Sequence, residues 1–146
     1  MGSAVSLRML WWLTDVARRA GAAMTAGDGT ATRLIVEALR RWDDTIPIVS
    51  EESDVTDEDS RPHSSRFWLV DPPDGANAFV PGESDFTVRI ALMDSDRPVA
   101  CVVFVPAADL VYFAGRNLGA WRQLGAQPAT RLRSELTPAV GELVSW

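Results

Sequence analysis

The hydrophobic pattern of the chain changes its period once, close to residue 45, and this change constrains the fold more than any other feature. Residues 4–23 and 29–42 repeat apolar side chains at helical spacing, with Gly21 and the Ala22-Ala23 pair closing the first helix and Thr25 or Asp28 available to cap the second. From residue 46 onward, apolar residues alternate with polar ones or form short runs between turn residues, as strands do. The chain therefore contains two helices followed by a series of strands.

These strands follow one another without intervening helices, which distinguishes the chain from proteins that alternate strands and helices. We predict strands at 46–49, 67–70, 86–92, 99–105, 110–114 and 120–124, and residues 129–133 and 142–146 are candidates for further short strands. The expected fold class is α+β, with two N-terminal helices packed on a mostly antiparallel sheet of five to seven strands. A strand at 142–146 would leave an exposed sheet edge, so we expect a homo-oligomer or a completing chain.

Length and charge limit the classes of protein to which the chain can belong. Its 146 residues suit a single domain over 1–146, and neither a linker nor an internal repeat divides it. The 20 acidic residues outnumber the 14 basic ones, all of which are arginine, and the net charge is −6. A negative chain attracts neither nucleic acid polymers nor anionic membranes. No apolar stretch reaches the ~18 residues that cross a bilayer and no signal peptide is recognisable, so we expect a cytoplasmic protein.

The single cysteine, Cys101, lies inside the apolar run 99–105. One thiol allows no internal disulfide, and its position in a strand-like run indicates a small buried hydrophobe. A role as a nucleophile is the alternative.

Three acidic residues follow two of the predicted strands. Glu51 comes after a strand that ends at Ser50, and Asp71 comes after a strand that ends at Val70. If the two strands are neighbours in one sheet, both carboxylates emerge at the same edge. The turn through Pro72 and Pro73 then brings Asp74 back toward Asp71.

Carboxylates that converge in this way repel one another unless they bind a proton or a cation. Oxygen ligands favour Mg²⁺, Mn²⁺ or Ca²⁺ over Zn²⁺, and the backbone carbonyl of Pro73 offers a fourth oxygen. Gly75 allows the backbone to approach a phosphate closely, and the N–H groups of residues 75–77 could bind it. Taken alone, this segment is better explained as a turn that contains acidic residues than as a metal site.

Three ordered motifs carry a resemblance to a known family. They are Val49-Ser50-Glu51-Glu52-Ser53, then Phe67-Trp68-Leu69-Val70-Asp71-Pro72-Pro73-Asp74-Gly75-Ala76, then Asp85-Phe86-Thr87-Val88-Arg89-Ile90-Ala91-Leu92. They resemble the Ser-Glu-Glu, Trp-Leu-Val-Asp-Pro-Leu-Asp-Gly-Thr and Phe-Thr-Val-Asn-Ile-Ala-Leu motifs of the inositol monophosphatase superfamily, and most closely those of its bacterial 3′(2′),5′-bisphosphate nucleotidases. The similarity extends from about Thr25 to Trp121.

The resemblance implies a Mg²⁺-dependent hydrolase of small phosphate monoesters, with two or three metal ions in the family and fewer here. Glu51, Asp71 and Asp74 match metal-bridging carboxylates, and Pro73 matches a carbonyl ligand. Glu51 also matches a residue that holds the attacking water, which Asp28 of the segment Thr25-Ala26-Gly27-Asp28 would help to activate. Gly75 and Ala76 match phosphate-binding positions. The implied fold is the N-terminal half of the family's layered architecture, without its C-terminal domain, and the implied partner is a small phosphorylated metabolite.

The sequence also departs from the family pattern. Ala76 replaces a threonine whose hydroxyl relays a proton, and Asn77 stands where the nucleotidases commonly have lysine. A long hairpin that precedes the Thr-x-x-Asp segment is missing, because Met24 leads directly into Thr25. These departures leave open a second interpretation, in which the chain is a catalytically degenerate relative that acts as a metal-binding scaffold or as half of an assembly.

Overall fold

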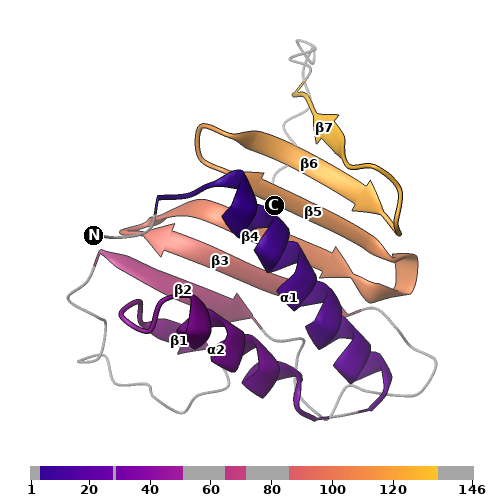
Figure 1. Cartoon of the computed structure of the whole chain (residues 1–146), viewed down its shortest axis with the longest axis horizontal. Helices are drawn as coiled ribbons and strands as arrows, with labels where there is room; N and C mark the ends of the chain where they lie inside the picture. Colours follow the sequence, from indigo (N-terminus) through magenta and orange to yellow (C-terminus); the bar gives the residue numbers. More distant parts are fainter. Residues whose placement is uncertain (1–3, 28, 51–64, 72–85, 135–146) are drawn as a thin grey trace, which may run out of the picture.

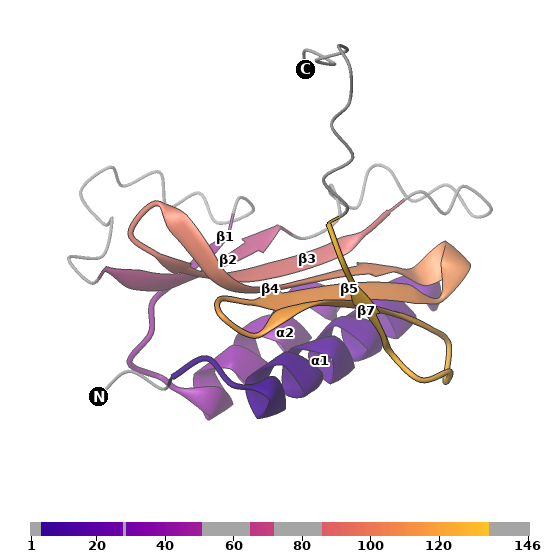
Figure 2. The same ribbon diagram turned by 90° about the horizontal axis from the view of Figure 1, so that it is seen from above.

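The computed structural model describes residues 4–27, 29–50, 65–71 and 86–134. In this part of the chain, two helices lie on one face of a seven-stranded sheet (Figures 1 and 2). The elements are α1 (Leu7–Thr25), α2 (Ala31–Trp42), β1 (Ile48–Ser50), β2 (Arg66–Asp71), β3 (Val88–Asp94), β4 (Arg97–Val105), β5 (Leu110–Gly115), β6 (Gly119–Leu124) and β7 (Thr130–Leu132). The predicted α+β class is confirmed.

The strands lie in the sheet in the order in which they occur along the chain. β1 and β2 are parallel, and each later strand is antiparallel to the one before it. The prediction of a mostly antiparallel sheet is therefore confirmed, and the strand expected at 129–133 is present as β7. The strand expected at 142–146 lies outside the described residues.

Helix α1 differs from its prediction at both ends. It begins after Ser6, whose side chain accepts a hydrogen bond from the Met9 backbone N–H at 3.2 Å, and it continues past Gly21 to Thr25. Gly21 does not end the helix because it packs against the sheet: a Cβ atom there would lie 2.6 Å from Cε1 of Phe104. The N-cap of α2 is Thr30, rather than Thr25 or Asp28.

The core lies between the two helices and the sheet. Trp68 of β2, Leu13 of α1 and Leu39 of α2 are all completely buried. Trp12 of α1 stacks on Trp42 of α2, with ring centroids 4.4 Å apart, and its ring centroid is 6.3 Å from that of Trp68. These contacts join both helices to the sheet, as the large apolar area of tryptophan allows.

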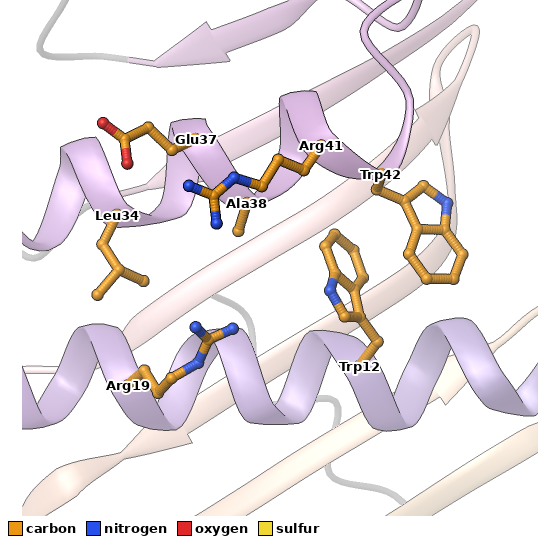
Figure 3. Close-up of a pocket in the computed structure, with 7 residues that line it drawn as sticks. All are labelled: Trp12, Arg19, Leu34, Glu37, Ala38, Arg41 and Trp42. Carbon is orange, nitrogen blue, oxygen red and sulfur yellow. The ribbon is translucent and has the colours of Figure 1, made fainter.

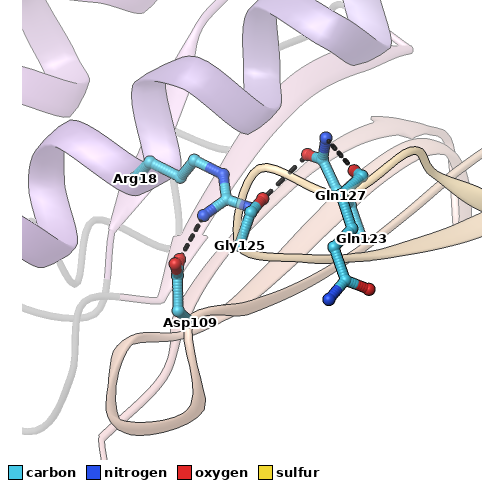
Figure 4. Close-up of polar contacts among 5 residues, drawn as sticks. All are labelled: Arg18, Asp109, Gln123, Gly125 and Gln127. Atoms are coloured by element: carbon cyan, nitrogen blue, oxygen red, sulfur yellow. Dashed lines mark hydrogen bonds and ion pairs between the residues drawn. The ribbon is translucent and has the colours of Figure 1, made fainter.

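A second connection between helix and sheet is polar and centres on Arg18 of α1 (Figure 4). Its guanidinium forms an ion pair with Asp109 and donates hydrogen bonds to the Gln123 side chain at 3.3 Å and the Gly125 carbonyl at 3.2 Å. The same group lies 5.2 Å from the centre of the Phe104 ring. Arg18 thus holds the C-terminal half of α1 against the turns that flank β5 and β6.

The other face of the sheet has a different character. The described residues place no helix on it, and both α1 and α2 lie on the opposite side (Figure 2). Residues of β2 alternate between the two faces, so that Trp68 and Val70 are buried while Leu69 is 36% exposed. We call the side away from the helices the open face. Within the described part of the chain, no helix is long and apolar enough to span a membrane.

Candidate functional site

The candidate site lies where β1 and β2 end, at the edge of the sheet that is formed by the C-terminal ends of these two parallel strands. The two strands are parallel, and Ser50 pairs with Val70. Asp71 is the last residue of β2, and Glu51 directly follows the last residue of β1. The condition on which the sequence argument depended, that these two strands are neighbours in one sheet, is therefore met.

Asp71 is the predicted metal ligand that the structure describes. It lies on the open face, and its side chain is 27% exposed. Its partner across the ladder is Arg89 of β3, whose guanidinium forms an ion pair with the Asp71 carboxylate. Asp71 is therefore partly shielded from solvent and already has one cationic neighbour.

The C-terminal end of α1 lies at the same end of the molecule. β4 runs parallel to β1 and β2, and the contact of Gly21 with Phe104 and Pro106 places the last turns of α1 beside the end of β4. Thr25 ends this helix, and its hydroxyl donates a hydrogen bond to the Gly21 carbonyl at 3.0 Å. Met24 and Thr25 both belong to the last turn of α1, so the helix leads directly into the segment that begins at Thr25.

The other predicted site residues, Asp28, Glu51, Pro73, Asp74, Gly75 and Ala76, lie outside the described residues. In the ranges that the structure does describe, no three histidine, cysteine or acidic side chains gather into a metal-binding group. The chain segments that carry the predicted ligands nevertheless start from one edge, because β1 ends at Ser50 and β2 ends at Asp71.

Sequence reasoning did not identify Arg89 as part of this site. A signal was present, because Arg89 stands where the matching family motif has asparagine. Its pairing with Asp71 depends on the register of β2 and β3, which the motif does not specify. Arginine is always charged and donates several N–H groups, so it competes with a metal ion for the Asp71 carboxylate.

The chemistry of the edge nevertheless suits a magnesium ion. A carboxylate at a strand end, partly exposed to water, is the type of oxygen ligand that Mg²⁺ prefers, since this ion keeps several waters and few protein ligands. Asp71 is in place to serve as such a ligand, provided that Arg89 yields part of its contact. Among the described residues, Asp71 thus fits the role of one Mg²⁺ ligand, and Arg89 is the cation that would compete for its carboxylate.

Cys101 offers little support for a nucleophilic role. It lies on the open face of β4 and is half-buried. Burial raises the pKa of its thiol, an effect that a backbone hydrogen bond involving Ala114 partly offsets. A raised pKa keeps the thiol protonated near neutral pH, and the protonated form is a poor nucleophile.

Comparison with known proteins shows which family this chain resembles. The model of the inositol monophosphatase family matches residues 14–141. The 3′(2′),5′-bisphosphate nucleotidase CysQ of Salmonella typhimurium is 36% identical over 117 residues, which make up 80% of this chain and 47% of that protein. The enzyme of the same name from Escherichia coli K12 is 34% identical over the same shares of the two chains.

Solved structures of the same family have a similar fold. CysQ from Bacteroides thetaiotaomicron, described as a bacterial member of the inositol monophosphatase family, superposes with a TM-score of 0.64 at 27% identity and covers 81% of this chain and 49% of that one. An inositol monophosphatase from Anabaena superposes with a TM-score of 0.63 at 28% identity, over 79% and 46% of the two chains. The present chain spans about half the length of the relatives that it matches.

Proposed function

The chain belongs to the inositol monophosphatase family, and from this premise we propose that it takes part in the Mg²⁺-dependent hydrolysis of small phosphate monoesters. The observation that carries the proposal is the parallel pairing of β1 and β2, which starts the segments after Ser50 and Asp71 from one edge of the sheet. The relatives named 3′(2′),5′-bisphosphate nucleotidase make a nucleoside bisphosphate the first substrate to test.

In the proposed site, the carboxylates of Asp71, Glu51 and Asp74 would hold Mg²⁺, together with the backbone carbonyl of Pro73. Bound magnesium ions would lower the pKa of water and neutralise charge on the phosphate. Glu51 would orient the water that attacks the phosphorus, and Asp28 would accept its proton. The P–O bond to the alcohol breaks in this step, and the leaving oxygen takes up a proton from solvent water. The backbone N–H groups at Gly75 and Ala76 donate to the phosphate oxygens, which glycine permits because it lacks a Cβ.

Arg89 has a separate role in this proposal. Its guanidinium balances the charge of Asp71 when no metal is bound, which lowers the repulsion among the three carboxylates. When a metal binds, the Arg89 side chain, which is 56% exposed, would be free to donate to a phosphate oxygen instead of to Asp71. The ion pair thus stabilises the Asp71 carboxylate in the metal-free chain and weakens metal binding.

The test measures phosphate released from adenosine 3′,5′-bisphosphate and from inositol 1-phosphate in the presence of Mg²⁺. We expect release by the full chain, loss of release in Asp71→Asn, and a gain of up to about 10²- to 10⁴-fold in Ala76→Thr, which restores a hydroxyl suited to proton transfer.

Asp94→Asn is the matched control for Asp71→Asn. Asp94 ends β3 at the opposite edge of the sheet, pairs with Arg66 at 3.8 Å, and is 33% exposed, close to the exposure of Asp71. The control should keep its activity. Absence of release in both the native chain and Ala76→Thr, with Mg²⁺ still bound, would instead support the interpretation as a metal-binding scaffold.

A further inference from the structure

A groove between α1 and α2 lies apart from the candidate site. It has a volume of about 350 Å³, and all of its lining residues come from the two helices (Figure 3). Leu34, Ala38 and Trp12 supply apolar surface, whereas Arg19 and Arg41 supply positive charge. The volume falls within the range of about 300–1,000 Å³ that is typical of small-molecule sites.

The two arginines come from different helices and both line this groove. Figure 3 shows the Arg19 guanidinium reaching from α1 toward α2, and the Arg41 guanidinium lying along α2 beside Ala38. Arg19 pairs with Asp15 through Nε at 3.0 Å, which leaves its terminal nitrogens available as donors. Among the described residues, Arg41 forms no ion pair within 4.0 Å. Two like charges therefore face one space with few compensating groups.

In the part of the chain that the structure describes, the acidic residue of the groove forms no ion pair within 4.0 Å with Arg19 or Arg41. Glu37 lines the groove, but Figure 3 shows its carboxylate directed away from the two guanidiniums. Arg33, one turn earlier on α2, lies 3.9 Å from the Glu37 carboxylate and offsets it further. An anion placed between Arg19 and Arg41 would relieve their repulsion and accept charge-assisted hydrogen bonds.

We propose that this groove binds a small organic anion that carries a flat apolar ring. The anionic group lies between the guanidiniums of Arg19 and Arg41. The ring lies against Ala38 and the Trp12 ring, on the side of the two guanidiniums away from Leu34 (Figure 3), and Trp12 offers it a favourable aromatic contact. Trp12 is held in place by its stacking on Trp42, so this wall of the groove is rigid before a ligand arrives.

Phenylphosphonate is a suitable probe, because it combines a ring with a dianion and contains no phosphate ester that the proposed activity could cleave. Its binding is measured by titration calorimetry of the full chain with excess EDTA, which removes metal from the Asp71 edge. We expect a saturable site whose affinity decreases with added salt, as for any partly exposed ion contact. Methylphosphonate, which lacks the ring, should bind more weakly.

The decisive variant is Arg19→Gln/Arg41→Gln, which should lose at least about tenfold in affinity. Its matched control is Arg8→Gln/Arg40→Gln, because Arg8 and Arg40 are exposed on the same two helices and do not line the groove. The control pair should retain its affinity. Thermal unfolding of both double variants checks that they fold.

Three results would overturn the proposal: absence of saturable binding, an equal loss in the control pair, or an affinity that falls in Asp71→Asn but not in Arg19→Gln/Arg41→Gln. The last result would place the anion at the edge of the sheet. Because metal is removed in this experiment, failure of the groove proposal leaves the test of phosphate ester hydrolysis unaffected.

Discussion

The two faces of the sheet differ in what they contribute to the molecule. On the face toward the helices, Trp68, Ile90 and Val102 lie in neighbouring strands and are at most 1% exposed. On the open face, Val49 is 38% exposed and Tyr112 is 38% exposed. The first face holds the folded chain together, and the second carries Asp71 and its ion pair with Arg89.

This difference separates stability from the proposed chemistry. Burial of apolar surface is the main favourable term in folding, so substitutions under the helices should affect folding first. Asp71 lies at the end of a strand on the other face, where a change of charge disturbs little packing. The site can therefore be altered in a chain that still folds, and the following predictions test this contrast.

The largest effect is expected from a matched pair of leucines on neighbouring strands. Leu92 of β3 is fully buried, and Leu69 of β2 is 36% exposed on the open face. Leu92→Ala should lower the free energy of unfolding by about 2–5 kcal/mol, because it leaves a cavity. Leu69→Ala should cost about 1 kcal/mol or less. Urea denaturation measures both, and equal losses would mean that the two faces contribute alike.

The next largest effect concerns the contact between α1 and the end of β4. In Gly21→Ala, the added methyl group would meet Phe104, which is buried and has little space to move. We expect a net loss of about 1–3 kcal/mol in the free energy of unfolding, despite the better helix propensity of alanine. Gly29→Ala is the control, since an added Cβ there meets no described residue within 4 Å other than its chain neighbours. Unchanged stability of Gly21→Ala would show that α1 can shift away from the sheet.

A smaller effect is expected from the polar connection on the helix side. Arg18→Gln removes the ion pair with Asp109 and the contact with the Phe104 ring, at a cost of about 1–2 kcal/mol in the free energy of unfolding. Arg19→Gln, on the same helix, removes only an exposed pair with Asp15 and should cost about 0.5 kcal/mol or less. Thermal unfolding compares the two variants, and an equal shift in both would contradict the account.

The smallest effect is expected from Arg89 on the open face. Its ion pair with Asp71 is partly exposed, and such pairs contribute about 0–1 kcal/mol to folding stability. Arg89→Asn should therefore leave folding nearly unchanged while raising the affinity for Mg²⁺ by up to about fivefold, because it removes a competing cation. A lower affinity for Mg²⁺ would mean that Arg89 supports the metal site instead of competing with it.

Much of this architecture was predictable from local pattern. The change of hydrophobic period indicated two helices before the strands, and strand ends at Ser50 and Val70 indicated a shared edge. Gly21 and the Ala22-Ala23 pair predicted an end of α1 at residue 23, whereas the helix continues to Thr25; the contact of Gly21 with Phe104 joins residues that are far apart in the sequence. The Asp71–Arg89 pair and the groove between the helices likewise depend on register and helix packing, which no local pattern contains.

Calorimetric titration of the chain with Mg²⁺ tests the central claim most directly. We expect saturable binding that Asp71→Asn abolishes and that Asp94→Asn, the matched change at the opposite edge of the sheet, leaves intact. Mg²⁺ binding by Asp71→Asn with the affinity of the native chain would show that the end of β2 does not hold the metal, and would contradict the account.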